Sequence, residues 1–129
     1  MEKKDLLKDV IKHIDIKSYN STELVDAMRN MSFTSRDTAR AADILMMMCK
    51  EKECTNILTL AGSTSAAGCM QVYVDMVRNK MIDVVVATGA SIIDMDLFEA
   101  LGYKHYIGEK ENVIPDTTLR DLYSDRIYD

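Results

Sequence analysis

The chain has 129 residues, of which 47% are hydrophobic and 29% charged, and its formal net charge is -5. This length corresponds to one domain, and this composition is that of a chain that buries a core. The acidic balance argues against binding to nucleic acid or to an anionic membrane surface, because both need a basic face. No apolar run approaches the roughly 18 residues that span a bilayer, and the charged N-terminus contains no signal-peptide core.

The three cysteines, Cys49, Cys54 and Cys69, are an odd number without a Cys-x-x-Cys pair. This pattern is typical neither of a disulfide framework nor of a zinc site. We therefore expect reduced thiols in a cytoplasmic protein that binds no metal.

The first 55 residues are expected to form a helical lead-in that packs on a sheet. Apolar residues recur every three or four positions within 1–19, which predicts a short amphipathic helix with His13 facing solvent. Residues 20–23 (Asn-Ser-Thr-Glu) predict a capping box for one helix. Residues 34–37 (Thr-Ser-Arg-Asp) predict a second box, for a helix over 35–51.

After residue 55 the hydrophobic period changes, and two short apolar runs each end in a loop of small, hydroxyl-bearing residues. The predicted elements are a strand at 56–61, a loop at 62–65, a helix at 66–80, a strand at 81–87, a loop at 88–91 and a helix at 94–100 capped by Gly102. This order is typical of βαβ units in a parallel sheet of the α/β class. The continuous Val, Ile and Leu content of the strands favours burial on both faces.

From residue 103 the chain becomes polar, and only a short helix at 117–123 is predicted there. Two strands make a poor sheet, because typical sheets have about four to six. We therefore expect residues 56–129 to be the first βαβ units of a domain that is incomplete without a C-terminal segment or a partner chain.

Ligands of an open parallel sheet bind at the carboxyl ends of its strands. Both predicted strands carry their loops there, each ahead of a helix N-terminus whose N–H groups favour an anion. A nucleotide or dinucleotide site is one interpretation, and plain strand-to-helix turns are the other. The first loop is neither a Gly-x-Gly-x-x-Gly motif nor a P-loop.

Polar side chains after the second loop have two interpretations as well. Asp94 and Asp96 either stabilise a helix N-terminus, by about 0.3–1 kcal/mol, or grip a ribose hydroxyl or a cationic substrate. For His105, a residue of a plain surface loop is the preferred interpretation, and a functional residue is the other. The sequence contains no plausible catalytic triad and no metal-ligand cluster.

Four ordered stretches resemble deoxyhypusine synthase, most closely its archaeal and bacterial branch, which also contains homospermidine synthase-like enzymes. These stretches are residues 60–68, 81–90, 97–102 and 125–129, and residues 37–42 fit the N-terminal part of the same family. The resemblance implies a Rossmann-like parallel sheet, a homotetramer arranged as a dimer of dimers, and bound NAD.

The activity that the resemblance implies belongs to hypusine biosynthesis. Spermidine is oxidised with NAD, and its 4-aminobutyl group passes as an imine to an enzyme lysine and then to a lysine of the translation factor 5A precursor. In homospermidine synthase-like members the acceptor is a small amine such as putrescine. An alternative of another class is a non-catalytic partner that regulates a full-length paralogue.

Carried over residue by residue, the resemblance implies cofactor contacts in both loops. The implied NAD-binding residues are Gly62, Ser63, Thr64, Ser65, Ala66, Thr88, Gly89, Ala90 and Asp94. Asp94, with Asp96 second, matches an acidic pair that reaches NAD and the polyamine.

The imine-forming lysine of the family has no match in this chain, because Lys104 and Lys110 lie on a polar segment without its motif. The chain is therefore expected to be the N-terminal portion of the enzyme, to contain no catalytic residue and to be inactive alone. A complementary C-terminal segment or chain would complete it.

Overall fold

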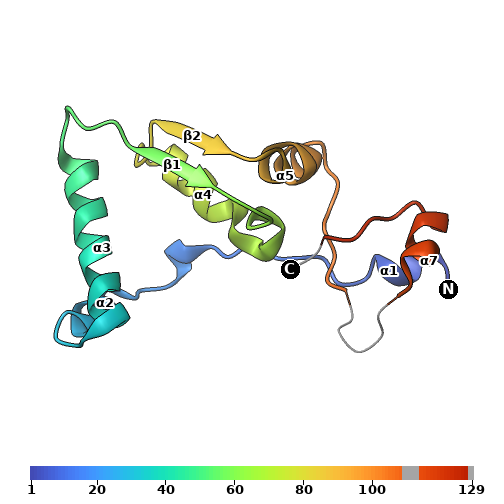
Figure 1. Cartoon of the computed structure of the whole chain (residues 1–129), viewed down its shortest axis with the longest axis horizontal. Coiled ribbons are helices and arrows are strands. Elements are labelled where there is room, and N and C mark those ends of the chain that lie inside the picture. Colours follow the sequence, from blue (N-terminus) through green and yellow to red (C-terminus); the bar gives the residue numbers. More distant parts are fainter. Residues whose placement is uncertain (109–113, 128–129) are drawn as a thin grey trace. The chain divides into compact units, whose positions relative to one another are not determined.

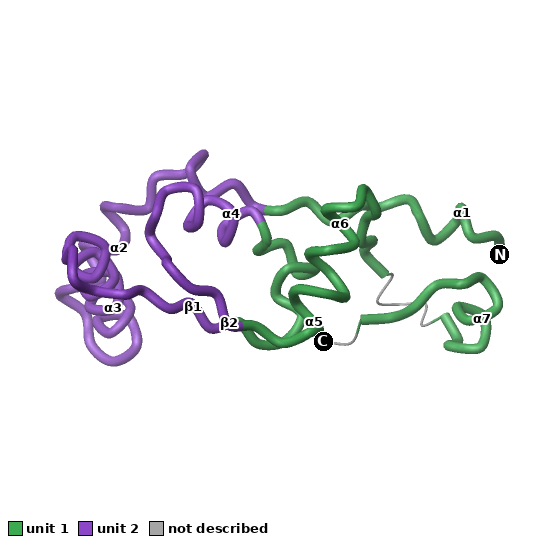
Figure 2. The backbone as a smooth tube through the Cα atoms, turned by 90° about the horizontal axis from the view of Figure 1, so that it is seen from above, with its two compact units in different colours: residues 1–13, 60–70, 87–129 green, residues 14–59, 71–86 purple. Residues whose placement is uncertain are grey.

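The computed structural model describes residues 1–108 and 114–127. It divides into two compact units (Figure 2): unit 1 takes residues 1–13, 60–70 and 87–129, and unit 2 takes 14–59 and 71–86. Each unit thus combines segments that are distant in the sequence. Most of both strands belongs to unit 2, and the loops that leave the strands belong to unit 1.

Unit 2 begins with the 3₁₀ turn η1 (Ile16–Ser18) and continues with the helices α2 (Thr22–Met28) and α3 (Phe33–Lys50), which pack against each other (Figure 1). The cap at α2 comes from Asn20, whose side chain accepts the N–H of Thr22 at 3.0 Å, while Ser21 makes no side-chain capping bond among the described residues. The second predicted capping box is wrong. Helix α3 begins at Phe33 after the cap residue Ser32, so Thr34 lies inside the helix, where its carbonyl accepts the hydroxyl of Thr38 at 2.8 Å.

The strands β1 (Ile57–Leu60) and β2 (Val84–Ala87) pair in parallel, as the sequence predicts (Figure 1). Hydrogen bonds from Asn56 hold their starting ends together. Its N–H donates to Asp83 Oδ2 at 2.8 Å, and its side-chain amide donates to the carbonyl of Met81 at 3.0 Å. Because the two strands are parallel, the loops that follow them leave the sheet at the same end.

The expectation that the strands are buried on both faces is wrong for this chain by itself. Val84, Val85 and Val86 are 41%, 39% and 54% exposed. Side chains of successive strand residues point to opposite faces, so both faces of β2 are open. Two strands of four residues each supply too few neighbours to cover one another.

The turns that follow the strands form the centre of unit 1. After β1 comes the π turn η2 (Ser65–Cys69), and α4 (Met70–Arg78) follows it. Gly68, inside η2, has φ +102°, so the predicted helix over 66–80 is interrupted there. After β2 comes one helical run made of α5 (Gly89–Ser91), the π turn η3 (Ile92–Leu97) and α6 (Phe98–Ala100), which begins earlier than the predicted helix over 94–100.

The predicted C-cap at Gly102 is confirmed. Gly102 has φ +98°, its N–H donates to Glu99, and the N–H of Tyr103 donates to Phe98, both at 3.0 Å. The rings of Phe98 and Tyr103 pack edge to face at 5.9 Å, which is the apolar contact that accompanies this cap.

The predicted amphipathic helix within 1–19 is wrong, because only α1 (Lys3–Leu6) and the turn η1 are helical there. Residues 9–13, here called the N-terminal strap, run beside residues 105–107. The N–H of Ile11 donates to the carbonyl of His105 at 2.9 Å, and the N–H of Ile107 donates to that of Asp9 at 2.7 Å. These backbone bonds to a distant segment replace the bonds of the expected helix.

Helix α7 (Asp116–Asp121) lies close to the helix predicted at 117–123. Of the stretch 125–129, Tyr128 and Asp129 lie outside the described residues. None of the described helices is long and apolar enough to cross a membrane. The described part of the chain also contains no group of three His, Cys, Asp or Glu residues arranged to hold a metal ion.

Candidate functional site

The two strand-end loops meet in unit 1 through buried contacts. The hydroxyl of Ser91 donates to the carbonyl of Gly62 at 2.7 Å, and the N–H of Ala66 donates to Met95 Sδ at 3.2 Å. Ser91 and Met95 are buried, and four residues separate them, so one face of the helical run supplies both contacts. The structure thus brings the two predicted loops together at the carboxyl ends of the strands.

The first loop contains two buried hydroxyl groups that no described residue bonds. Gly62 is exposed, Ser63 and Thr64 are half-buried, and Ser65 and Ala66 are buried. The buried oxygens Thr64 Oγ1 and Ser65 Oγ have no hydrogen-bond partner among the described residues. An unpaired buried polar group costs about 1–3 kcal/mol, so the first loop carries two hydroxyls whose hydrogen bonding the described residues do not satisfy.

The second loop opens the helical run with an uncapped N-terminus. Thr88 and Gly89 are exposed and Ala90 is half-buried. Thr88 is the cap residue, but its side chain makes no capping bond within the described chain. A Cβ added to Gly89 would meet no described atom within 4 Å, so the backbone there is open to approach. First-turn N–H groups have no partner inside a helix, and they favour an anion.

The two aspartates lie on opposite sides of η3. Residues two apart on a helix do not share a face. Asp94 is exposed, whereas Asp96 is half-buried, and its Oδ1 atom is buried without a partner among the described residues. The role of Asp94 stays a prediction, and Asp96 has the more enclosed carboxylate.

Glu99 joins two histidines that sequence reasoning placed in solvent. Its carboxylate accepts His13 Nε2 at 2.7 Å and His105 Nδ1 at 2.8 Å, and the side chains of Glu99, His13 and His105 are 8%, 19% and 15% exposed. Burial raises the pKa of Glu99, but the hydrogen bonds from His105 and His13 outweigh it, and the pKa lies below its ordinary value. No local signal predicts this cluster, because 86 residues separate His13 from Glu99.

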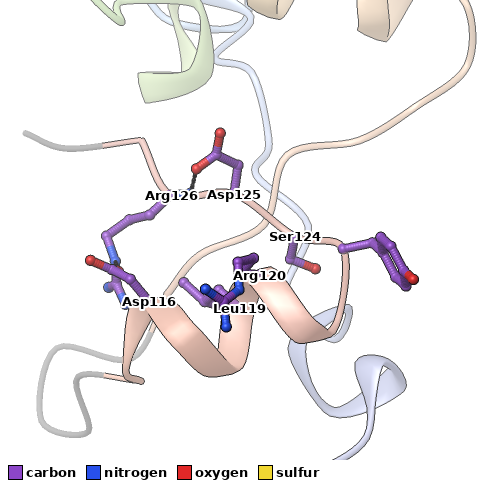
Figure 3. A pocket seen from close by; sticks show the side chains of 7 residues that line it. Asp116, Leu119, Arg120, Ser124, Asp125 and Arg126 are labelled. Atoms are coloured by element: carbon purple, nitrogen blue, oxygen red, sulfur yellow. Dashed lines mark hydrogen bonds and ion pairs between the residues drawn. The ribbon is translucent and has the colours of Figure 1, made fainter.

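A separate hollow of about 460 Å³ lies beside α7 in unit 1 (Figure 3). Its lining residues are Asp116, Leu119, Arg120, Tyr123, Ser124, Asp125 and Arg126. None of them comes from the two loops. Arg126 donates to Asp116 Oδ1 at 3.2 Å and to the carbonyl of Ile114, so this part of the stretch 125–129 ties the chain to the start of α7.

Two parallel strands with helices between and after them, and with their carboxyl-end loops in contact, are features of a Rossmann-like α/β domain. The family model for deoxyhypusine synthase matches residues 23–129. The chain therefore belongs to the deoxyhypusine synthase family, a family of enzymes, and the resemblance drawn from the four sequence stretches is confirmed.

Relatives of known sequence agree with this assignment. The chain is 60% identical over 128 residues to a deoxyhypusine synthase-like protein of Caulobacter vibrioides, covering 99% of this chain and 34% of that protein. It is 54% identical over 127 residues to a deoxyhypusine synthase-like protein of Coxiella burnetii, covering 98% of this chain and 36% of that protein. It is 38% identical over 116 residues to a probable deoxyhypusine synthase 2 of Methanosarcina acetivorans, covering 90% of this chain and 33% of that protein. The chain thus spans about a third of the length of these relatives.

Proposed function

We propose that this chain is the NAD-binding portion of a deoxyhypusine synthase-like enzyme, which transfers the 4-aminobutyl group of spermidine to a lysine of the translation factor 5A precursor. The observation that carries the proposal is the meeting of the two strand-end loops through Ser91 and Gly62. Membership of the deoxyhypusine synthase family supports the reaction class.

The residues of both loops fit the chemistry of NAD. The unpaired hydroxyls of Thr64 and Ser65 can bond phosphate or ribose oxygens, and the first-turn N–H groups at Gly89 and Ala90 suit a pyrophosphate. Gly89 has no side chain to keep a phosphate away from the backbone. When bound, NAD would supply the chemistry of hydride uptake from spermidine and hydride return.

Carboxylates supply the second half of the proposed site. Spermidine is a polycation, and Asp94 and Asp96 place two carboxylates on η3, which begins directly after Ser91. Asp96, with its buried unpaired oxygen, is suited to a ribose hydroxyl or to an ammonium group held away from water. Asp94 at the surface is suited to attract the incoming polycation.

The proposed chemistry needs a lysine that this portion does not supply. Lys104 is exposed on the segment after α6, and Lys110 lies outside the described residues. We assign the imine-forming lysine to a complementary C-terminal segment or chain, which would also cover the open strands in a homotetrameric assembly. Alone, the chain is expected to transfer no aminobutyl group.

The test is calorimetric titration of NAD into the assembly that contains this chain. The variants Thr64→Val and Ser65→Ala should each weaken binding by about two- to twelvefold, the effect of losing one hydrogen bond of about 0.5–1.5 kcal/mol. Thr117→Val, on the exposed surface of α7, is the matched control and should bind NAD like the parent. If Thr64→Val and Ser65→Ala both fold and bind NAD unchanged, the loops are plain turns and the proposed site is wrong.

The acceptor is tested by offering the same assembly radiolabelled spermidine with either the translation factor 5A precursor or putrescine. Label on the precursor supports the proposal, whereas label in homospermidine identifies the alternative activity. If neither product forms and the chain instead changes the rate of a full-length paralogue, the chain is a regulatory partner.

A further inference from the structure

The His13–Glu99–His105 cluster is a set of interactions that the proposed chemistry does not use, and within it His13 Nδ1 is buried without a hydrogen-bond partner among the described residues. An ionised carboxylate can only accept hydrogen bonds, so His13 Nε2 and His105 Nδ1 are the donors. Hydrogen bonds to a charged group are roughly twice as strong as neutral ones, and low exposure keeps water from replacing them. The cluster is therefore a strong joint between the N-terminal strap and the end of the helical run.

The strap contacts η2, the turn that follows the first proposed cofactor loop, and α6, the helix that follows η3. At its Lys12 carbonyl it lies so close to Gly68, at the end of η2, that a Cβ there would be 3.2 Å away. At His13 it holds Glu99 on α6, at the far end of the run that begins at Gly89. The backbone bonds of residues 9 and 11 to residues 105–107 fix the strap itself.

The run between the second loop and Glu99 needs such a support. Its middle is the π turn η3, and π turns are short, rare interruptions of α-helical geometry. Ser91 fixes the start of η3 against Gly62, and Asp94 and Asp96 lie within it. Met95, inside η3, accepts the N–H of Ala66, and a further fixed point beyond the C-terminal end of η3 would hold that end of the turn as well.

We propose that the strap and the His13–Glu99–His105 cluster are a positioning device that holds η2 and η3, and with them the two cofactor loops, in one arrangement. The positioning residues are His13, Glu99 and His105, and all three lie outside the two loops that are proposed to bind the cofactor. This inference rests on the proposed function only for the identity of the ligand, because the coupling between strap and loops exists without NAD.

The experiment measures amide hydrogen exchange over residues 62–69 and 89–97 in the NAD-free assembly. Replacing His13 by Ala should raise exchange in both segments by about ten- to a hundredfold, the effect expected from the loss of one hydrogen bond to a charged group. NAD affinity should fall by a similar factor. His13→Gln, whose side-chain amide can still donate to Glu99, should retain most of the protection. Glu99→Gln, which loses the charge and one acceptor oxygen, should lose protection as His13→Ala does, and it serves where His13→Ala does not fold.

Lys17→Ala is the matched control, because Lys17 Nζ binds the buried Asp75 Oδ1 at 2.8 Å and ties the same N-terminal region to α4 in unit 2. It should leave exchange in 62–69 and 89–97 unchanged. The inference is overturned if His13→Ala raises exchange only within 9–13 and 105–107, or equally throughout the chain. If the parent binds no NAD, the proposed function fails, and the exchange pattern still decides the positioning role.

Discussion

Gly68, beside the proposed site, and Gly89, within it, are positions where a side chain is excluded or unfavourable for different physical reasons. Gly68 has φ +102°, a left-handed conformation that disfavours a side chain, and the Lys12 carbonyl lies 3.2 Å from the position of a Cβ. Gly89 begins α5 with ordinary helical geometry, and the space around it is open among the described residues. The first glycine serves the fold, and the second leaves room for a ligand.

Substitution by alanine should separate these two roles. Gly68→Ala should lower the free energy of unfolding by about 1–3 kcal/mol, because it forces a strained backbone conformation. Gly89→Ala should leave stability unchanged or raise it by up to about 1 kcal/mol, while weakening NAD binding. Thermal unfolding and NAD titration of the assembly measure both effects. Equal loss of stability in the two variants would contradict this assignment.

The hydroxyl of Ser91 is the direct link between the loops. Ser91→Ala leaves the Gly62 carbonyl without its donor, so we expect a loss of about 0.5–1.5 kcal/mol in the free energy of unfolding. Ser63→Ala is the control, because the described residues offer the Ser63 hydroxyl no hydrogen bond. Chemical denaturation measures both variants. A Ser63 variant that is as destabilised as the Ser91 variant would show that the link is not specific.

At the scale of elements, two carboxylates, one on α6 and one on α4, bind side chains of the N-terminal segment. Glu99 on α6 binds His13 in unit 1, and Asp75 on α4 binds Lys17 in unit 2. The hydrogen bond from Lys17 lowers the pKa of Asp75. The pKa of Glu99 is also lowered, since the bonds from its two histidines outweigh burial.

The lowered pKa values of Asp75 and Glu99 predict that the folded protein loses stability in acid. A carboxyl group whose pKa is lower in the folded protein stabilises the fold above its ordinary pKa, and this contribution is lost as the pH falls through the folded-state value. The melting temperature of the assembly should therefore fall below about pH 4, where carboxylates take up protons. Glu99→Gln and Asp75→Asn should each make the fall less steep. An unchanged pH profile in both variants would show that other groups cause acid unfolding.

At the scale of the whole molecule, the open strands decide how the chain behaves. Ile57 of β1 and Val86 of β2 are more than half exposed, and both strands have an unpaired edge in the two-stranded sheet. Exposed apolar edges pair with other chains. We expect the isolated chain to aggregate, and to become monodisperse only with a complementary chain.

A charged substitution on the open strand should therefore have opposite effects in the two states. Val86→Lys should reduce aggregation of the isolated chain, because lysine blunts an open edge. In the complete assembly the same change should lower the melting temperature, because it buries a charge in the covered sheet. Light scattering of the chain and calorimetry of the assembly test the two expectations. A monodisperse, cooperatively melting parent monomer would contradict both.

The sequence by itself determined the element types and the family of this protein. Strands β1 and β2, helix α3 and the cap at Gly102 follow from patterns that span a few residues, since strand alternation, helical spacing and turn chemistry are local. The family followed from four ordered stretches of sequence, and the matching family model confirms it. The loop residues stay predictions for ligand contact, although their place at the strand ends is as expected.

Only the tertiary structure decided which of these local features meet. The N-terminal region has helical spacing, but its residues 9–11 bond to residues 105–107, because backbone pairing with a distant segment outweighs a weak local preference. The sequence predicts that His13 faces solvent, but the fold brings Glu99 and His105 beside it. The sequence predicts that the strands are buried, but their side chains are exposed in this structure. Burial depends on neighbouring elements, and two short strands do not provide enough of them. Local periodicity thus fixes what each segment can become, and long-range contacts fix what it packs against.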